Sequence, residues 1–343
     1  MAVSIHDVAD RAGVSVATVS RSFTAPETVR ETTRRKVLEV AAELGYRANR
    51  AARGLITGKT GNIGLIVPDL GNPYFHGVLK GAQQRARAAD YAVFIADGQE
   101  RATEEEALIG AMSKQVHGIV LCSSRLDPAT LAALEPSPAV VLLNRRVPGL
   151  ATVTIDSAGG MRQAMEHLTA LGHVRCAFVS GPRRSWSNQQ RLRGLRAAAR
   201  TAGAEIVTIG PVAPQFQGGV AAAEPALASG ATAVLAYNDL VAAGILSRLA
   251  ELGVEVPREL SVVGFDDIPL AAMLTPALTT VAAPTVRAGA VAVETLLAGL
   301  AAGTEEPVQP PAPAEHELAA RLVIRGSTAA PTPALPTTLE RTV

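Results

Sequence analysis

Aromatic residues and cysteines are scarce in this sequence. Phe, Trp and Tyr together make up 3% of its 343 residues, and only two cysteines are present, Cys122 and Cys176. Both lie inside apolar runs, and neither has a Cys or His neighbour at metal-ligand spacing. We therefore interpret them as small buried residues of strands, in preference to a disulfide or a nucleophile.

Long apolar runs are also missing. Polar or charged residues interrupt every apolar run before it reaches the roughly 18 residues that a membrane-spanning helix needs. Residues 1–20 carry acidic side chains and lack the apolar segment of a secretory signal. With 48% hydrophobic and 18% charged residues, the chain has the composition of a soluble protein of two or three domains, which we expect to be cytoplasmic.

Patterns typical of enzymes are missing as well. The six histidines are scattered, no glycine-rich dinucleotide loop follows a strand, and no GxSxG elbow is present. Asp266 and Asp267 are adjacent on an extended run, so their side chains point in opposite directions and make a poor acid–base pair. We expect no enzymatic activity, no cofactor and no metal.

One stretch imitates a nucleotide-binding loop. Residues 53–64 read RGLITGKTGNIG, in which three residues separate Gly54 from the Gly58–Lys59 pair, whereas the phosphate-binding loop needs four. That loop also follows a buried strand, but here an arginine-rich polar segment comes before it and the strand-like run comes after it. The stretch is therefore predicted to have another role.

Positive charge is concentrated near the start of the chain. Residues 1–60 contain ten Lys or Arg and six Asp or Glu, a net charge of +4, while the whole chain has a net charge of +1. Within residues 34–59 the count is seven basic to two acidic. A basic segment joined to a nearly neutral body indicates a polyanionic partner.

The same region has the pattern of three short helices. Apolar residues recur at helical spacing over residues 5–12, and Gly13 suits the left-handed conformation that follows a helix end. Ser15 is placed to cap a second helix over residues 16–22, and a third is predicted over residues 32–46. Two short helices joined by a glycine-containing turn form a helix-turn-helix, although the helix pattern alone fits an αα-hairpin without a ligand equally well.

The sequence letters narrow this interpretation. The first sixty residues resemble the DNA-binding headpiece of the lactose-repressor (LacI/GalR) family in two successive stretches, DVADRAGVSVATVSR and TRRKVLEVAAELGYRANRAARGL. The resemblance continues along almost the whole chain. It implies a transcriptional regulator, expected to be a repressor, that binds a palindromic operator in double-stranded DNA as a homodimer. The headpiece would be residues 1–48, and residues 49–60 would be the hinge helix and linker, which explains the stretch that imitates a nucleotide loop.

The resemblance also assigns DNA contacts. Val16, Ala17 and Arg21 match the base-reading positions, and Arg21 can make a bidentate contact to guanine. In the hinge, Leu55 matches the apolar wedge that opens the central base step, with Ala52 and Arg53 against the minor groove. Contacts to phosphate or sugar are expected from five further residues: Ser4, Ser15, Thr18, Ser20 and Asn49. The hydroxyl residues among them could instead cap helices or be solvated.

After residue 60 the pattern alternates between strand-like and helical segments. Repeated βα units of this length, with about ten strands in all, predict parallel sheets with helices on both faces. We therefore expect an α/β fold: an all-α headpiece and a two-lobed, periplasmic-binding-protein-like body of doubly wound parallel sheets. The first lobe is predicted over residues 61–156 and 285–312, and the second over residues 157–284 and 313–327. The Pro- and Thr-rich residues 328–343 are predicted to be disordered.

Ligands of such lobes bind at the carboxyl ends of the strands. By resemblance to the family, the switch is a small-molecule effector, expected to be a sugar or sugar derivative. A carboxylate can accept from neighbouring hydroxyls, an arginine can donate to oxygens, and an aromatic ring can cover a sugar face. The matching positions are Tyr74, Phe75, Asn144, Ser185, Ser187, Arg191, Phe216, Asn238 and Asp266.

Purely structural interpretations, without a ligand, remain open for several of these residues. Arg191 and Asp266 could form a structural salt bridge, and Tyr74, Phe75 and Trp186 could be core or lobe-interface residues. A sugar-binding protein of the periplasmic type without a regulatory role is the alternative function. No leucine heptad follows the body, so assembly beyond a dimer is not predicted.

Overall fold

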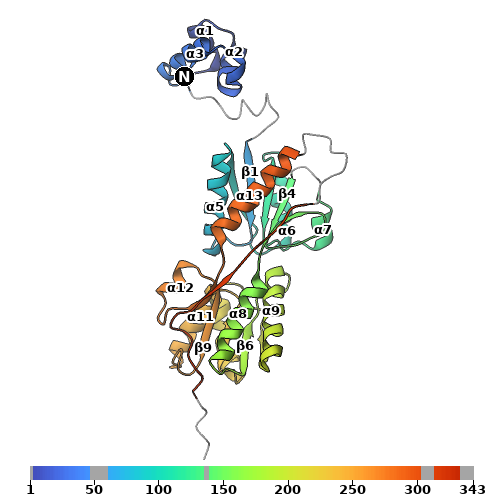
Figure 1. The fold of residues 1–343 in the computed structure, drawn as a ribbon, viewed down its shortest axis with the longest axis vertical. Helices are drawn as coiled ribbons and strands as arrows, with labels where there is room; N and C mark the ends of the chain where they lie inside the picture. Colours follow the sequence, from blue (N-terminus) through green and yellow to red (C-terminus); the bar gives the residue numbers. More distant parts are fainter. Residues whose placement is uncertain (1–2, 47–60, 135–138, 303–312, 333–343) are drawn as a thin grey trace, which may run out of the picture. The chain divides into compact units, whose positions relative to one another are not determined.

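The computed structural model describes residues 3–46, 61–134, 139–302 and 313–332. The chain divides into two compact units, Met1–Gly61 and Asn62–Val343, and each is described by itself (Figure 1). The predicted hinge residues Asn49, Ala52, Arg53 and Leu55 lie outside the described residues. Among the described residues, no helix has the length and apolar character required to span a bilayer.

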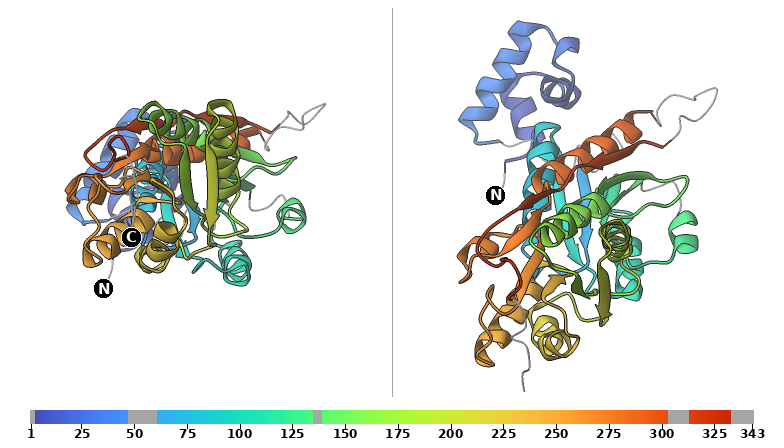
Figure 2. Two further views of the ribbon diagram at one scale, coloured as in Figure 1. Left: turned by 90° about the horizontal axis from the view of Figure 1, so that it is seen from below. Right: turned by 60° about the horizontal axis from the view of Figure 1, so that its bottom comes forward.

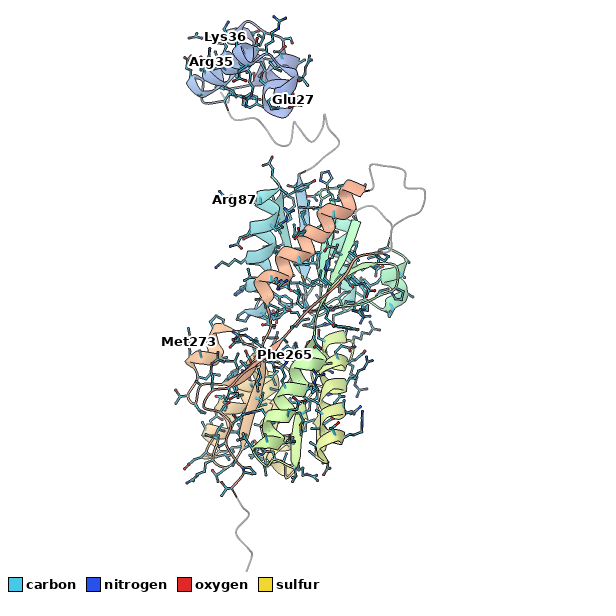
Figure 3. All side chains as sticks on the ribbon, viewed as in Figure 1. Glu27, Arg35, Lys36, Arg87, Phe265 and Met273 are labelled. Carbon is cyan, nitrogen blue, oxygen red and sulfur yellow. The ribbon has the colours of Figure 1, made fainter. Side chains whose placement is uncertain are left out.

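The first unit is a three-helix headpiece. It contains α1 (Ile5–Ala12), α2 (Val16–Thr24), the short 3₁₀ helix η1 (Pro26–Thr28) and α3 (Glu31–Glu43). The second helix runs two residues further than predicted, because the first residue that cannot continue it is Pro26. Figure 3 shows the side chains of this unit, with Arg35 and Lys36 of α3 on its outside.

Local sequence signals account for the ends of α1. Ser4 and Asp7 form a reciprocal capping box, in which the Ser4 hydroxyl accepts from the Asp7 N–H and the Asp7 carboxylate accepts from the Ser4 N–H. Gly13 follows with φ of 67°, the left-handed conformation that glycine adopts without steric cost. The three helices enclose a small apolar core that consists of Val8, Ala9, Ala12, Val19, Val37, Val40 and Ala41.

The second unit contains two six-stranded sheets, each the centre of one lobe (Figures 1 and 2). All strand pairs are parallel except β10 with β12. In spatial order, the first sheet consists of β11 (Glu315–Leu318), β5 (Ala151–Ile155), β4 (Ala139–Leu143), β3 (Gly118–Cys122), β1 (Asn62–Val67) and β2 (Ala92–Asp97). The second consists of β12 (Arg321–Val323), β10 (Thr279–Ala282), β9 (Ser261–Asp266), β8 (Ala233–Ala236), β6 (Arg175–Val179) and β7 (Glu205–Ile209).

Helices cover the sheets, as Figure 2 shows. The first lobe carries α5 (Tyr74–Ala88), α6 (Ala102–Met112), α7 (Pro128–Ala132) and α13 (Thr285–Ala302). The second carries α8 (Ser157–Ala170), α9 (Trp186–Ala202), α10 (Phe216–Ala228), α11 (Asp239–Glu251) and α12 (Pro269–Met273). The alternation of strands and helices predicted from the sequence is therefore confirmed, and both cysteines are buried without a disulfide, in β3 and β6.

The chain crosses between the lobes three times. It leaves the first sheet after β5, returns to that lobe with α13, and crosses again between β11 and β12. Helix α13 packs against α5, and the two approach at the level of the backbone: a Cβ on Gly81 would collide with the Val286 carbonyl, and one on Gly289 with the Val78 carbonyl. These glycines let α13 lie directly on α5 (Figure 1).

Two expectations about the end of the chain differ from the structure. Residues 313–327 were assigned to the second lobe, but β11 pairs with β5 and so belongs to the first sheet. Its sequence, EHEL, carries charge on an edge strand and gives no apolar strand signal. Residues 328–332, predicted to be disordered, are placed: His173 Nε2 donates to the Ala329 carbonyl (2.9 Å), and the Ala329 N–H donates to the Ser261 hydroxyl (3.1 Å). Residues 333–343 lie outside the described residues.

Candidate functional site

The predicted DNA-contact residues of α2 lie on its exposed side. Val19 is fully buried in the headpiece core, whereas Ala17 and Arg21 are exposed, one helical turn apart. The Arg21 Nε–H donates to the Ala17 carbonyl (3.3 Å), and the rest of the guanidinium has no ion pair among the described residues. Val16 and Ser20 are half-buried. The α2 surface thus combines a small apolar patch with one cation, which suits base-edge contacts.

Two of the predicted phosphate contacts are also helix caps. Ser4 caps α1, and the Ser15 hydroxyl accepts from the Thr18 N–H (3.2 Å) at the start of α2. The hydroxyls of Ser15 and Thr18 are hydrogen-bonded to each other (2.9 Å). Capping does not remove these residues from the surface, since Ser4 and Ser15 are exposed.

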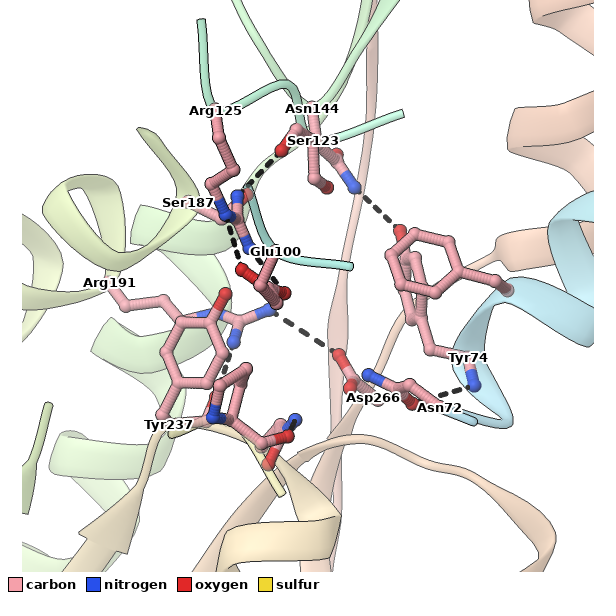
Figure 4. A pocket seen from close by; sticks show the side chains of 13 residues that line it. Asn72, Tyr74, Glu100, Ser123, Arg125, Asn144, Ser187, Arg191, Tyr237 and Asp266 are labelled. Atoms are coloured by element: carbon pink, nitrogen blue, oxygen red, sulfur yellow. Dashed lines mark hydrogen bonds and ion pairs between the residues drawn. The ribbon is translucent and has the colours of Figure 1, made fainter. Parts of the chain in front are cut away.

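A pocket lies between the two lobes of the second unit, at the carboxyl ends of their strands (Figure 4). Seven of the nine predicted effector residues line it: Tyr74, Phe75, Asn144, Ser187, Arg191, Asn238 and Asp266. Asp266 ends β9, and the others lie in the loops and helices that follow strand ends, the region that parallel α/β sheets use for ligands. The remaining lining residues are Asn72, Glu100, Ser123, Arg125, Pro214 and Tyr237.

Ser185 and Phe216 do not line this pocket. Ser185 caps α9, and its hydroxyl lies 3.1 Å from the Tyr237 hydroxyl. Phe216 is the first residue of α10 and is 39% exposed. Sequence reasoning missed Glu100 and Arg125, each three residues beyond the end of a strand. After β2 and β3 the sequence reasoning considered only Asp97 and Ser123, and a wider window after these two strands would have found both.

Arg191 and Asp266 form the buried charged pair of the pocket. Arg191 Nη2 lies 3.4 Å from Asp266 Oδ1, and both side chains are more than nine-tenths buried. The Arg191 guanidinium also donates to the Tyr237 carbonyl and stacks over the Phe265 ring, 3.7 Å from its centroid. Its Nε has no hydrogen-bond partner among the described residues. Burial raises the pKa of Asp266 to about 7, although Arg191 opposes that rise.

A neutral hydrogen-bonded pair faces this charged pair. Asn144 Nδ2 donates to the Tyr74 hydroxyl over 2.6 Å, and Asn144 Oδ1 accepts from the Ile155 N–H (3.2 Å). The Asn72 side chain in turn accepts from the Tyr74 N–H (3.0 Å). Burial raises the pKa of the Tyr74 hydroxyl, which therefore stays neutral. Tyr74 and Phe75 meet edge to face, with centroids 5.0 Å apart.

A second ion pair comes from the first lobe alone. Arg125 donates to both carboxylate oxygens of Glu100, over 2.6 and 2.9 Å, and to the Ser123 carbonyl over 2.6 Å. The backbone N–H of Arg125 donates to the Glu105 carboxylate (2.8 Å). Three of the five guanidinium N–H donors of Arg125, including Nε–H, already have partners, whereas the Nε–H of Arg191 has none among the described residues.

Backbone strain gathers at the same place. Glu100, Ser123, Asn144 and Asp266 have positive φ angles of 56°, 48°, 55° and 116°. Non-glycine residues rarely adopt this region, and such residues cluster at functional sites because the surrounding structure must hold them. Four strained residues from four different strand ends therefore make this pocket the candidate functional site of the second unit.

The lobes are closed around the pocket. Its cavity volume is about 30 Å³, whereas sites for small ligands usually enclose several hundred. Among the described residues, two hydrogen bonds join the lobes outside the pocket: Gln215 Nε2 donates to Asp69 (2.9 Å), and Arg145 donates to the Arg184 carbonyl (3.4 Å). A sugar-sized ligand enters only if the lobes move apart. Within the described ranges, no group of three or more His, Cys, Asp or Glu side chains is arranged to hold a metal ion.

Comparison with known proteins covers both units. Residues 4–49 match the family described as bacterial regulatory proteins, lacI family, and residues 165–328 match the periplasmic binding protein-like domain. The chain is 36% identical to the HTH-type transcriptional regulator GalS of Salmonella typhimurium, over 88% of this chain and 91% of GalS. It is similar to the lac repressor dimer bound to operator and the anti-inducer ONPF, with a TM-score of 0.82 and 27% identity over 96% of this chain and all of that one. It is also similar to the complex of the transcriptional regulator CelR with cellobiose, with a TM-score of 0.68 and 28% identity over 95% of this chain and 99% of that one.

Proposed function

This chain belongs to the lacI family of bacterial regulatory proteins, and on that premise we propose that it switches transcription in response to a small molecule. Two headpieces of a homodimer would read a palindromic operator, because one α2 surface offers too few base contacts for a specific site. In this proposal Arg21 supplies the hydrogen-bonded base contact, and Val16 and Ala17 contact thymine methyl groups. The position of the headpiece along the DNA is fixed by contacts to the sugar–phosphate backbone from Ser4, Ser15, Thr18 and Ser20.

The proposal divides the chain by role. Residues 1–48 bind DNA and residues 49–60 form the hinge, in which Leu55 would open the central base step while Asn49, Ala52 and Arg53 lie along the groove. The two lobes that follow bind the effector and hold the dimer together. Strand β11 counts with the first lobe, because it completes that sheet.

The effector is proposed to be a polyhydroxylated small molecule, most simply a sugar. The supporting observation is the pocket itself: a buried carboxylate, a buried arginine with an unused Nε–H, and aromatic rings around them. Asp266 would accept from neighbouring hydroxyls and Arg191 would donate to an oxygen, with Tyr74 and Phe75 against the apolar face of the ring. The similarity to a regulator solved with cellobiose supports this class.

The proposed switch is the angle between the lobes. Since the closed cavity is far smaller than a sugar, ligand binding selects an open arrangement or a differently closed one. A ligand shifts such an equilibrium only through its different affinity for the two states. A changed lobe angle would alter the spacing of the two hinges across the dimer and so the affinity for operator.

The proposal assigns no catalytic step to the chain. The similar proteins named above are DNA-binding regulators, and the pocket pairs its carboxylates with arginines instead of presenting an acid and a base to a substrate. A sugar-binding protein without a regulatory role would share the lobes but would not bind a specific DNA sequence.

Two measurements test the function together. A thermal-shift screen of the full chain against sugars, nucleosides and sugar phosphates identifies the effector, because a ligand that binds the folded state raises the melting temperature by mass action. Operator binding is then measured by fluorescence anisotropy with and without the hit. We expect a sequence-specific, dimeric complex whose affinity changes with the ligand. Equal, purely salt-governed binding to every duplex, with or without the ligand, would contradict the proposal.

A further inference from the structure

A second and larger cavity lies in the two-lobed unit, apart from the central pocket. Its volume is about 490 Å³, within the usual range for small-ligand sites, and it shares no lining residue with the central pocket. Both lobes contribute to it: the loop before β5 and the strand β11 from the first, and α9 from the second. The lining residues are Arg146, Pro148, Ile155, Asp156, Ser157, Ala158, Trp186, Gln190, Arg193 and Glu317.

Helix α9 stands between the two cavities. Ser187 and Arg191 reach the central pocket, whereas Trp186, Gln190 and Arg193 line the larger cavity. The last three are spaced at i, i+4 and i+7 and therefore share one stripe of the helix. The larger cavity thus has its own face of α9.

The polar groups of this stripe are unused. Trp186 is the only tryptophan of the chain and is half-buried. Among the described residues, neither the Gln190 amide nor the Arg193 guanidinium has a hydrogen-bond or ion-pair partner, and the Trp186 ring stacks on no other ring. A flat apolar ring, an amide and a cation therefore line one cavity without partners among the described residues.

The opposite wall offers charges of both signs. Arg146 lies 3.6 Å from Glu315, an exposed and therefore weak pair. Asp156 caps α8 through Oδ1, which accepts from the Gly159 N–H (2.7 Å). Glu317 is exposed and has no ion-pair partner among the described residues. The wall thus presents carboxylate oxygens as acceptors beside the arginine.

The surroundings of the stripe are strongly basic. Residues 183–200 contain six arginines and no Asp or Glu, in a body whose net charge is negative. All six except Arg191 are exposed. An exposed helix face normally mixes charges of both signs, so this segment favours an anionic partner, and Arg193 is its member that lines the cavity.

We propose that this cavity binds a nucleoside phosphate. The base stacks on Trp186, with the Gln190 amide at its polar edge, since base–indole stacking is favourable for every base. The phosphate binds to Arg193 and Arg146. The ribose hydroxyls donate to the carboxylates of Glu317 and Asp156. A ligand of this class uses the ring, the amide, both cations and both acceptors that line the cavity.

Trp186 provides the measurement, because it is the only tryptophan in the chain. Its fluorescence in the full-length protein is titrated with AMP, GMP, CMP and UMP, and in parallel with adenosine, ribose 5-phosphate and inorganic phosphate. We expect saturable quenching by at least one nucleotide, with at least tenfold weaker binding of the three partial ligands. No saturable change with any nucleotide, or equal binding of inorganic phosphate or ribose 5-phosphate, overturns the proposal.

Variants locate the binding and separate it from the central pocket. Arg193→Gln, at an exposed position that the fold does not need, should weaken nucleotide binding about tenfold or more, as for loss of a charge-assisted hydrogen bond. Arg200→Gln, two turns along the same helix and outside the cavity, should leave it unchanged. Asp266→Asn removes the carboxylate of the central pocket and should also leave it unchanged, even if the sugar response is lost. Loss of quenching in Asp266→Asn but not in Arg193→Gln would place the nucleotide in the central pocket and refute the inference.

Discussion

The Arg191 guanidinium lies over the Phe265 ring and directs Nη2 at the Asp266 carboxylate, 3.4 Å away. Because both side chains are buried, neither is exposed to bulk water; burial raises the pKa of the Asp266 carboxyl, and Arg191 opposes that rise. The sequence left two interpretations of this pair open, a structural salt bridge and a ligand contact, and the structure contains the salt bridge. It also leaves Arg191 Nε available for the second.

Replacing Asp266 by asparagine should remove the effector response and keep DNA binding. The amide has nearly the same shape but cannot accept with the strength of a carboxylate, so we expect effector affinity to fall at least tenfold. Operator affinity without ligand should stay within about twofold, because the headpiece is a separate unit. The matched control is Asp267→Asn, whose carboxylate pairs with Arg325 instead of Arg191. An Asp266→Asn protein that responds at the original ligand concentration would refute the assignment.

The stability of the protein should depend on pH through Asp266. Its pKa is about 7 in the folded state and 3.8 in its ordinary state, so the folded chain binds this proton more tightly. The stabilisation that comes from protonated Asp266 is therefore fully present below pH 3.8 and is lost as pH rises towards and through 7. Relative to Asp266→Asn, the wild type should lose up to about 4 kcal/mol over this window. Denaturation curves of both proteins at several pH values measure the difference, and parallel pH profiles would disprove the shift.

The Tyr74 hydroxyl should contribute to stability through Asn144. In Tyr74→Phe, the buried Asn144 Nδ2 loses its 2.6 Å acceptor, and an unsatisfied buried donor costs about 1–3 kcal/mol. Tyr91→Phe is the control, because its hydroxyl has no hydrogen-bond partner among the described residues. Urea denaturation should show a lower free energy of unfolding for Tyr74→Phe alone. Equal effects of the two changes would mean that Asn144 finds another partner.

Arg21 should determine the base preference at one symmetric pair of operator positions. Arg21→Ala removes the only cation on the exposed side of α2, and we expect it to relax base preference there by about 1–3 kcal/mol. Selection from a randomised operator library, followed by sequencing of bound DNA, gives the preference at each position. Arg87→Ala, in the separate body (Figure 3), is the control. A base preference that Arg21→Ala leaves intact would exclude this residue from base recognition.

Leu55 should be needed for operator bending. Shortening it in Leu55→Ala removes the proposed wedge, so specific affinity should fall and the bend should decrease. A circular-permutation mobility assay reports the bend, and non-specific DNA provides the reference for affinity. The same bend angle in wild type and variant would show that Leu55 does not open the base step.

Much of this protein could be predicted from short stretches of sequence. Ser4, Asp7 and Gly13 fix the first helix through contacts within a few residues, and Ser15 does the same for the second. Apolar runs with turn residues behind them predicted strands β1 to β10 of the two sheets, but not β11 or β12. Because parallel strands place their carboxyl ends at one edge, the strand ends indicated the region of the pocket, and the resemblance to the family selected the residues within it.

The three-dimensional fold decided what depends on partners distant in sequence. The place of β11 is set by pairing with β5, more than 150 residues earlier, and its four residues contain no signal of that choice. Ala329 is held by His173 and Ser261, although its neighbourhood has the composition of a disordered tail. Glu100 and Arg125 entered the pocket by pairing across two loops. Caps and periodicity are local properties that a sequence displays directly, whereas strand pairing and ion pairs across loops exist only after the chain has closed on itself.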